Sequence, residues 1–304
     1  GQRWSVPIAE LMPTASAIAV QIAVGRFDHG GLASICDTID TSDGLPVSKK
    51  TENVRGLYLE GIRDGKPRQA INKYAGSRYT QHSTGVPDGP RGFVEFFEDF
   101  IVRNPKRDIR LARIFEDGRY VFVHAFQSLN DGAAEWVTMD FFDTDSDDKM
   151  IEHWDVITSF TDETPSGHTS IDGPTDVIDL DRTGDNKTLV LRMIEDLLME
   201  GGHPDQVGDY ISAEQYIQHN SEVPDGLENF QRLAISDNRP LVYDEVVLLV
   251  GQGNFVATLC RTRWHGEPYA QADLFRVDAG LIVEHWDAAE PIGPEETWLN
   301  SGKF

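Results

Sequence analysis

The chain contains the same block of sequence twice. Residues 79–93 read YTQHSTGVPDGPRGF, and residues 216–230 read YIQHNSEVPDGLENF. A second pair follows in the same order, because MDFFDTDSDDKMIEHWD at 139–155 returns as ADLFRVDAGLIVEHWD at 272–287, one residue shorter. Solenoid repeats have periods of roughly 20 to 50 residues, far shorter than the separation between these blocks. The pattern therefore predicts a duplicated domain.

The length of the chain agrees with two such units. At 304 residues it exceeds the roughly 100 to 200 residues of one domain, and each unit is large enough for its own core. We expect an N-terminal extension, a first copy, a linker and a second copy, with the bounds 1–47, 48–163, 164–184 and 185–304. The linker is rich in Pro, Gly, Ser, Thr and Asp.

The composition limits the partners. The 51 acidic and 27 basic side chains give a formal net charge of -24, so nucleic acid and anionic membrane surfaces are not expected to bind. The apolar stretch from Ala15 to Gly25 is too short to span a bilayer and is expected to be a core or interface helix. Cys36 and Cys260 are too far apart in the sequence to form a metal-binding or redox motif, so we expect both to be buried residues in a reducing compartment. We therefore expect a cytoplasmic protein.

Each copy begins with a helical pattern and then changes period. Residues 53–65 and 189–204 carry apolar side chains at helical spacing and end in Gly and Pro. The β-branched and aromatic runs that follow alternate as in strands, with hairpin turns expected at 143–149 and 278–280. Helices followed by an antiparallel meander predict an α+β unit with its helices on one face of a curved sheet.

Asp140 and Asp273 are the first candidates for chemistry. They lie on expected strands among apolar neighbours, in DFF and DLF. A carboxyl group at such a position either faces water or is buried with a raised pKa, and the second case produces a general acid or base near neutral pH. The sequence leaves both alternatives open.

The histidines fall into two groups. His82 and His219 precede a VPDG turn, where each could act as a proton shuttle at a pocket mouth or bond to local backbone. In the repeated EHWD, His and Trp alternate along one strand and point to opposite faces. We expect Trp154 and Trp286 to form pocket wall and the histidines beside them to face the surface, although the opposite strand phase would exchange the two faces.

The copies differ at one position that bears on chemistry. A constant offset of 133 residues, from Gly118 and Gly251 to Asp140 and Asp273, pairs His124 with Ala257. No HxH, HExxH or CxxC occurs, and no Gly-rich phosphate loop opens a helix, so we expect neither a metal nor a cofactor.

The two blocks together resemble the SnoaL-like branch of the NTF2-like superfamily, in particular its group of predicted aldol-condensation enzymes. The resemblance rests on YIQHNSEVPDG and DLFRVDAGLIVEHWD and covers about four fifths of the chain. It implies two cone-shaped α+β domains in tandem, forming a pseudo-dimer within one chain, with further homo-oligomerisation left open. The first copy departs from the pattern at QHST, and the second has Ala257 where the family has a strand histidine.

The resemblance also implies residue roles. In related polyketide cyclases a late-strand aspartate is the acid/base group, and it falls on Asp140 and Asp273, with His82, His124 and His219 as companions. The residues expected to contact a substrate are Tyr79, Trp136, Trp154, Tyr216, Asn220, Tyr269 and Trp286. Because His124 of the first copy aligns with Ala257 of the second, we expect the first copy to carry the more complete set of catalytic residues.

The expected function is cofactor-independent acid/base chemistry on a small carbonyl or polyketide-like substrate, as in an aldol-type cyclase, isomerase or lyase. Two alternatives remain open at the level of sequence. One is a protein that binds a small apolar ligand without catalysis, and the other is a hydrolase in which an aspartate activates water.

Overall fold

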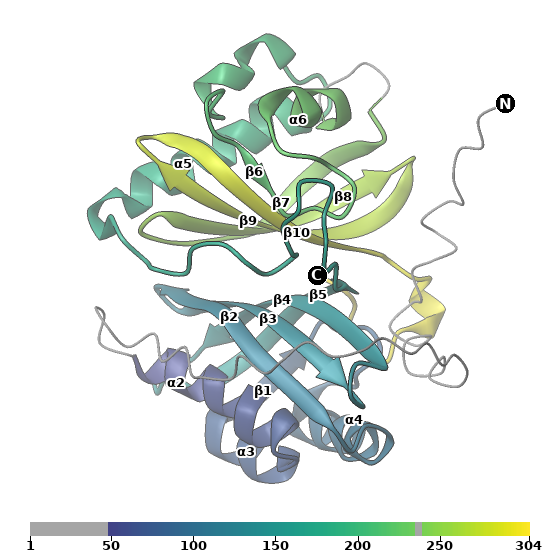
Figure 1. The fold of residues 1–304 in the computed structure, drawn as a ribbon. Coiled ribbons are helices and arrows are strands. Elements are labelled where there is room, and N and C mark those ends of the chain that lie inside the picture. Colours follow the sequence, from purple (N-terminus) through teal and green to yellow (C-terminus); the bar gives the residue numbers. More distant parts are fainter. Residues whose placement is uncertain (1–47, 235–238) are drawn as a thin grey trace, which may run out of the picture.

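The computed structural model describes residues 48–234 and 239–304. The expected extension at 1–47, including the helix at Ala15 to Gly25 and Cys36, lies outside these residues. The described residues form an α+β structure with two five-stranded sheets, which confirms the predicted α+β class (Figure 1). Cys260 is buried, as expected. None of the helices described here is long and apolar enough to cross a membrane.

The first sheet and its helices come from the first half of the chain. Ser48 caps the opening helix by accepting a hydrogen bond from the backbone N–H of Thr51. The helices are α2 (Lys49–Gly56), a π-helix (Leu57–Arg63), α3 (Pro67–Tyr74) and α4 (Gly89–Arg103). The strands are β1 (Ala75–Gln81), β2 (Arg107–Asp117), β3 (Tyr120–Leu129), β4 (Ala134–Thr144) and β5 (Met150–Ser159). Their order in the sheet is β1-β5-β4-β3-β2, with β1 parallel to β5 and the other pairs antiparallel.

The second half repeats this order. Its helices are α5 (Thr183–Met193), a π-helix (Ile194–Leu198), α6 (Leu227–Ala234) and three 3-10 turns (Leu180–Arg182, Pro204–Asp209, Glu295–Thr297). Its strands are β6 (Ile217–Gln218), β7 (Leu241–Gln252), β8 (Phe255–Trp264), β9 (Glu267–Asp278) and β10 (Leu281–Pro291), in the order β6-β10-β9-β8-β7. The turns expected at 143–149 and 278–280 do connect β4 to β5 and β9 to β10.

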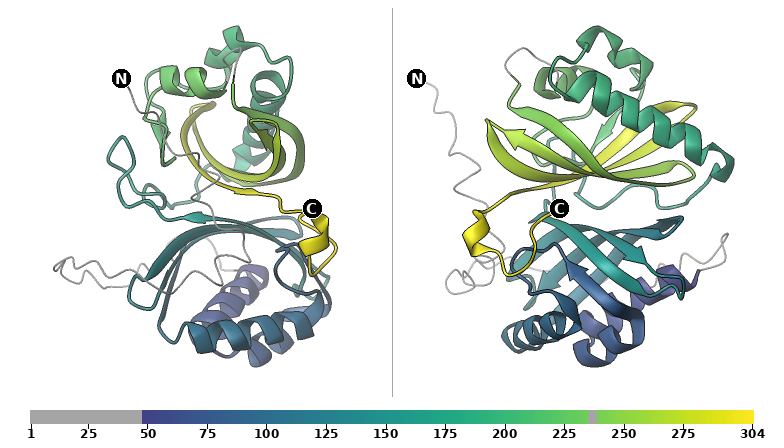
Figure 2. Two further views of the ribbon diagram at one scale, coloured as in Figure 1. Left: turned by 90° about the vertical axis from the view of Figure 1, so that its right-hand side faces the viewer. Right: turned by 180° about the vertical axis from the view of Figure 1, so that it is seen from behind.

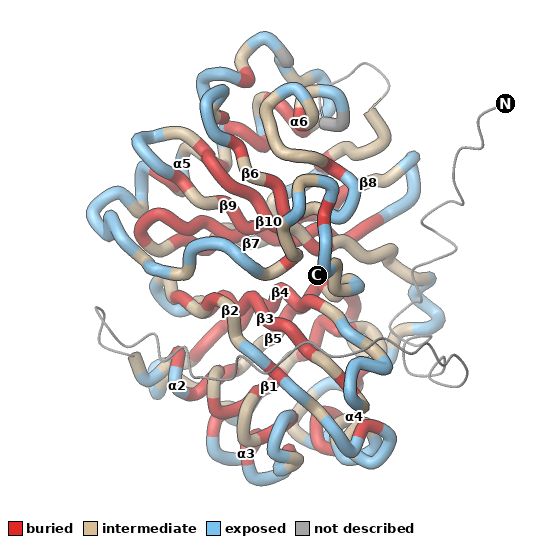
Figure 3. Tube along the Cα trace, in the orientation of Figure 1, coloured by how far each residue is buried: buried red, intermediate tan, exposed pale blue. Residues whose placement is uncertain are grey.

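The two sheets pack against each other, and each curves toward its own helices on the outer side (Figures 1 and 2). A cluster of large apolar side chains from both sheets fills the space between them, including Phe122, Phe141 and Trp154 from one half and Phe255 and Trp286 from the other. Figure 3 shows the buried residues concentrated along the strands in the middle of the molecule. Both faces of each sheet are therefore covered, one by helices and one by the other half.

Each half is followed by a segment that crosses to the other half. The first crossing segment, residues 160–174, packs on the second half, where Trp286 donates from its indole N–H to the carbonyl of Asp172 at 3.0 Å. The second crossing segment, residues 292–304, packs on the first half, where Leu299 donates to the carbonyl of Thr84 at 2.9 Å. The expected linker at 164–184 is thus a packed part of the fold rather than a simple spacer, and α5 already begins at Thr183.

The cluster between the sheets predicts a large effect of truncating Phe122, which is fully buried 5.0 Å from the ring of Phe115 and 5.1 Å from that of Phe141. Phe122→Ala should lower the free energy of unfolding by about 3 to 5 kcal/mol, measured by urea denaturation. The control Val102→Ala, at a side chain that is 79% exposed, should change it by less than about 0.5 kcal/mol. Equal effects of the two substitutions would contradict the packing described here.

Candidate active site

The strand phase of EHWD decides which side chains face the pockets, and it is the reverse of the expected one. His153 and His285 are buried and line the pockets. Trp154 and Trp286 face the interface between the halves, and each stacks on a histidine ring of its own half, His82 and His219, with centroids 4.8 and 4.5 Å apart. The expectation was wrong because the outer face of this strand is not exposed to water: it is an interface that buries aromatic side chains.

The first pocket lies between the helices and the sheet of the first half and has a volume of about 120 Å³. Its polar lining includes Gln81, Gln127, Asp140, His153 and Asp155, with Ser83, Arg103, Asn104 and Thr138 also on the wall. Phenylalanine rings form much of the remaining wall, at positions 93, 96, 97, 100 and 142. A few polar groups in an apolar cavity are typical of a small-molecule site.

A chain of hydrogen bonds fixes the proton positions in this pocket. Gln81 Oε1 accepts from the backbone N–H of Ser83 at 3.0 Å and contacts His153 Nδ1 at 2.8 Å. Because that oxygen can only accept, Nδ1 of His153 must carry a proton. His153 Nε2 lies 2.9 Å from Asp140 Oδ1, and this bond needs a further proton, on either atom. The pair is therefore an imidazolium with a carboxylate or a neutral imidazole with a carboxylic acid.

The second carboxyl oxygen of Asp140 makes no hydrogen bond to the described residues. Asp140 is only 3% exposed, and its Oδ2 has no hydrogen-bond partner among the described residues. Burial, and then the charge of Asp140, raise the pKa of Tyr58 and of Tyr79 well above the usual value, so both phenols stay protonated. For Tyr58 an interaction of its hydroxyl with the Asp140 carboxyl adds to the rise in pKa, so this phenol lies next to that carboxyl. Both also line the pocket. The pocket thus places an unoccupied carboxyl oxygen near two phenols.

The negative charge of Asp155 is balanced by a lysine of the second crossing segment. Lys303 Nζ lies 3.0 Å from Asp155 Oδ1 and is also paired with Glu290. Burial opposes ionisation of Asp155, but the charges of Lys303 and His153 outweigh it and lower the pKa of the carboxyl. The pKa of Lys303 is raised, because the charges of Asp155 and Glu290 outweigh the effect of burial. An ionised Asp155 can then stabilise an imidazolium at His153.

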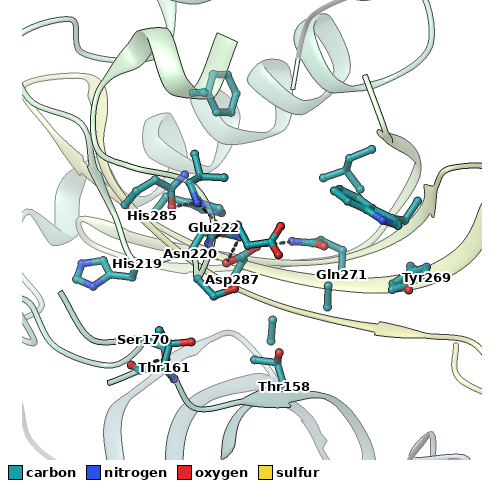
Figure 4. Close-up of a pocket in the computed structure, with 18 of the residues that line it drawn as sticks. Thr158, Thr161, Ser170, His219, Asn220, Glu222, Tyr269, Gln271, His285 and Asp287 are labelled. Carbon is teal, nitrogen blue, oxygen red and sulfur yellow. Dashed lines mark hydrogen bonds between the residues drawn. The ribbon is translucent and has the colours of Figure 1, made fainter. Parts of the chain in front are cut away.

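The second pocket, in the second half, is larger, at about 290 Å³ (Figure 4). His285 Nε2 lies 3.0 Å from Asp273 Oδ1, and His285 Nδ1 lies 3.0 Å from Gln218 Oε1, which repeats the arrangement of the first pocket. Burial lowers the pKa of His285, but the hydrogen bond to Asp273 and the charges of Asp273 and Asp287 outweigh it, and the pKa is raised.

Asp273 differs from Asp140 in having no free oxygen. Tyr243 donates to its two oxygens at 3.1 Å each, Gln271 donates to Oδ1 at 3.0 Å, and the Thr258 hydroxyl lies 3.4 Å from Oδ2. Asp273 is completely buried and does not line the second pocket. Asp287 and the exposed Glu222 supply the carboxyl groups that line this pocket. Burial raises the pKa of Asp287 more than the charge of His285 lowers it.

The other expected site residues are divided between the pockets and the core. Tyr79 and Trp136 line the first pocket, while His219, Asn220 and Tyr269 line the second. Tyr216 packs edge to face on Phe230 within the core. His82 does not line the first pocket. Its Nδ1 donates to the carbonyl of Gly302 at 2.7 Å, and its Nε2 contacts Glu152 at 3.0 Å.

The expected role of His124 is wrong. Its neighbour Val123 pairs with Asp140 across β3 and β4, so alternation sends the His124 side chain to the interface between the halves. There its Nδ1 lies 3.1 Å from Arg113 Nη1. Burial and the charge of Arg113 lower the pKa of His124 well below its usual value. His124 therefore cannot account for a difference between the two pockets.

The sequence analysis missed the pocket residues Gln81, His153, Asp155, Gln218, His285 and Asp287. All six lie in the repeated QH and EHWD motifs, and the correct strand phase of EHWD would have identified His153, Asp155, His285 and Asp287. Asp140, His153 and Asp155 also bring potential metal-ligand atoms within 4.8 Å of one another, although no metal was expected. An ion there would have to break the Asp140–His153 hydrogen bond and compete with Lys303 for Asp155.

No protein-family model matches the chain, and no curated protein matches it. Solved structures that are similar in part include a candidate SnoaL-like polyketide cyclase from Jannaschia sp. CCS1, at 18% identity over 38% of this chain and 91% of that one, with a TM-score of 0.32. A candidate ketosteroid isomerase from Kribbella flavida matches at 17% identity over 37% and 84%, with a TM-score of 0.32. TsrD from Streptomyces laurentii matches at 14% over 37% and 91%, with a TM-score of 0.32.

The Lys303 ion cluster leads to a prediction for stability and pH. Lys303→Met leaves Asp155 and Glu290 without their cation, and breaking a buried ion pair in this way costs about 3 to 5 kcal/mol. The lowered pKa of Asp155 contributes stability above its unfolded pKa, and that contribution is lost as pH falls through the folded pKa. Urea denaturation should therefore show a deficit of the variant that is large at neutral pH and shrinks toward acid.

The double variant Lys303→Met/Glu290→Gln tests the same cluster with one charge fewer. It should be more stable at neutral pH than Lys303→Met alone, since only Asp155 remains to be ionised without a cation. A deficit of Lys303→Met that does not change with pH would show that lost packing, not charge, is the cause.

Proposed function

We propose that the first pocket is an acid/base active site for a small carbonyl compound, with the chain acting as an aldol-type cyclase, isomerase or lyase. The observation that carries this proposal is Asp140: one of its oxygens is bound to His153, and the other is buried without a partner at an apolar pocket. A carboxyl group in such surroundings is suited to removing a proton from carbon and returning it elsewhere.

The proton balance follows from the hydrogen bonds. At rest, Asp140 and His153 share one proton besides the one that Nδ1 donates to Gln81. Asp140 Oδ2 takes the proton α to the substrate carbonyl, so the pair then holds two. It returns one to the new alkoxide or to a different carbon, and the site is regenerated without net gain or loss of protons.

The developing negative charge on the substrate oxygen needs a hydrogen-bond donor. The phenols of Tyr58 and Tyr79 line the pocket and remain protonated because of their raised pKa values. We assign this role to them in place of an imidazole, since both ring nitrogens of His153 are already engaged. The phenylalanine walls exclude water and favour a compact apolar substrate body.

Substitution of equivalent aspartates tests the proposal with a control from the same chain. The substrates for this test are carbonyl compounds that a thermal-shift screen identifies as ligands. General acid/base groups contribute about 100 to 10,000-fold in rate, so Asp140→Asn should lower the turnover rate of these compounds by that factor. Asp273→Asn, at a carboxyl whose oxygens are both occupied, should keep most of the activity.

Three outcomes of these assays would point away from the proposed acid/base enzyme. Ligand binding without turnover by the unaltered protein would indicate a binding protein. Incorporation of oxygen-18 from labelled water into the product would indicate a hydrolase that uses Asp140 to activate water. Equal losses in the two aspartate variants would reject the assignment of catalysis to the first pocket.

We also propose that the halves are two NTF2-like domains, 48–163 and 185–304, which arose by duplication and form a pseudo-dimer within one chain. Equal strand order and equivalent contacts support this. Tyr79 packs on Phe93 with centroids 5.9 Å apart, and Tyr216 packs on Phe230 at 5.7 Å. Linking the units raises their effective concentration for each other.

A further inference from the structure

The two crossing segments make the same contact with opposite halves. His82 Nδ1 donates to the carbonyl of Gly302 at 2.7 Å, and His219 Nδ1 donates to the carbonyl of Thr169 at 2.8 Å. The residues that follow, Lys303 and Ser170, therefore occupy equivalent positions. Lys303 reaches the pocket carboxyl of the first half, and Ser170 lines the second pocket.

The first half shows how an ammonium group binds at this position. Lys303 is 4% exposed, and its Nζ lies between Asp155, at 3.0 Å, and Glu290. Asp155 is the carboxylate of EHWD in the first half, and Asp287 is the corresponding one in the second. Glu290 corresponds to Thr158, three residues beyond the same Asp, and Thr158 also lines the second pocket.

The second half has the carboxyl group but lacks the cation. Asp287 accepts hydrogen bonds only from neutral donors: Asn220 Nδ2, at 3.0 and 2.8 Å, and Gln271 Nε2, at 3.3 Å. No lysine or arginine is among the described residues that line this pocket. The nearby His285 is paired with Asp273 at 3.0 Å, as His153 is with Asp140.

The second pocket has free volume at the position that corresponds to the Lys303 side chain of the first half. In Figure 4, Asp287 lies between Asn220 and Gln271, and Thr158 of β5 and Ser170 of the first crossing segment lie on the opposite side of the pocket. Ser170 Oγ is held by the backbone of Thr161, with the Thr161 N–H donating to it at 2.7 Å. The volume of about 290 Å³ exceeds that of the first pocket, about 120 Å³.

We propose that the second pocket binds a small primary amine, whose ammonium group contacts Asp287 at the position that Lys303 occupies in the first half. Ser170 and Thr158 line the pocket across from Asp287. The Ser170 hydroxyl donates to the carbonyl of Thr161 at 3.1 Å, and its remaining lone pair, like the oxygen of Thr158, can accept an ammonium proton. The apolar body of the ligand packs on the aliphatic and aromatic wall, formed by Leu198, Phe230, Leu241, Trp264 and Phe275. This site is independent of the acid/base function proposed for the first pocket.

Calorimetric titration tests the proposal with n-butylamine, n-hexylamine and 2-phenylethylamine on the full chain. The neutral control 2-phenylethanol and the anion 3-phenylpropanoate have a similar body without the positive charge. We expect at least one amine to bind, with the alcohol weaker by about tenfold or more and no binding of the anion.

Two substitutions and one control locate the site. Asp287→Asn should weaken amine binding by about tenfold or more. Ser170→Lys should abolish it, because a tethered ammonium group then occupies the position, as Lys303 does in the first half. Asp278→Asn removes one carboxylate at an exposed turn residue and should leave the affinity unchanged.

Several results would overturn the proposal. These are no binding of any of the three amines at millimolar concentration, equal affinity for 2-phenylethylamine and 2-phenylethanol, and amine binding that survives Ser170→Lys in a variant shown to be folded by circular dichroism. If Asp287→Asn does not fold, Ser170→Lys alone decides, since its tethered cation mimics an interaction that the first half already contains.

Discussion

Alternation of side chains along the last strand of each half is the constraint on which both the pockets and the interface depend. In β5, His153 and Asp155 face the pocket while Trp154 faces the other half, and β10 repeats this with His285, Asp287 and Trp286. One strand thus supplies the titratable groups of the site and the aromatic contact that joins the halves. Reversing its phase would bury the carboxylates in the interface and leave the pockets without their polar groups.

The interface therefore contributes to both pockets. The crossing segments that hold the halves together also deliver one residue to the neighbourhood of each pocket carboxyl, Lys303 in one case and Ser170 in the other. Burial raises the pKa of both carboxyls, but the charges of Lys303 and His153 outweigh it at Asp155, whose pKa is lowered, while the pKa of Asp287 stays raised. Two pockets of similar design consequently differ in charge and in size, and we assign them different ligands.

Much of the architecture could be predicted from the sequence. The repeated blocks and the change of period predicted α+β units, and the turn sequences at 143–149 and 278–280 placed the hairpins correctly, because turns and periodicity are local. Asp140 also stood out as a candidate because it is a polar residue among apolar neighbours, but the sequence left open whether it is exposed or buried. The structure places it buried at a pocket.

The strand phase could not be predicted in the same way, because both faces of β5 are buried and neither can be recognised by polarity. His and Trp each have an apolar body and a polar edge, so either suits a pocket. The misplacement of His124 has a related cause: its partner Arg113 lies on the adjacent strand and faces the second half. Lys303 is 148 residues from Asp155, and no local pattern connects them.

Nitrogen-15 NMR of the His153 ring tests the central claim most directly, because the claim rests on where the protons of this ring lie. The account predicts that Nδ1 carries a proton, donated to Gln81, and that the Nε2 resonance reports a shared proton which changes in Asp140→Asn. A neutral ring with its only proton on Nε2, unaffected by Asp140→Asn, would contradict the account.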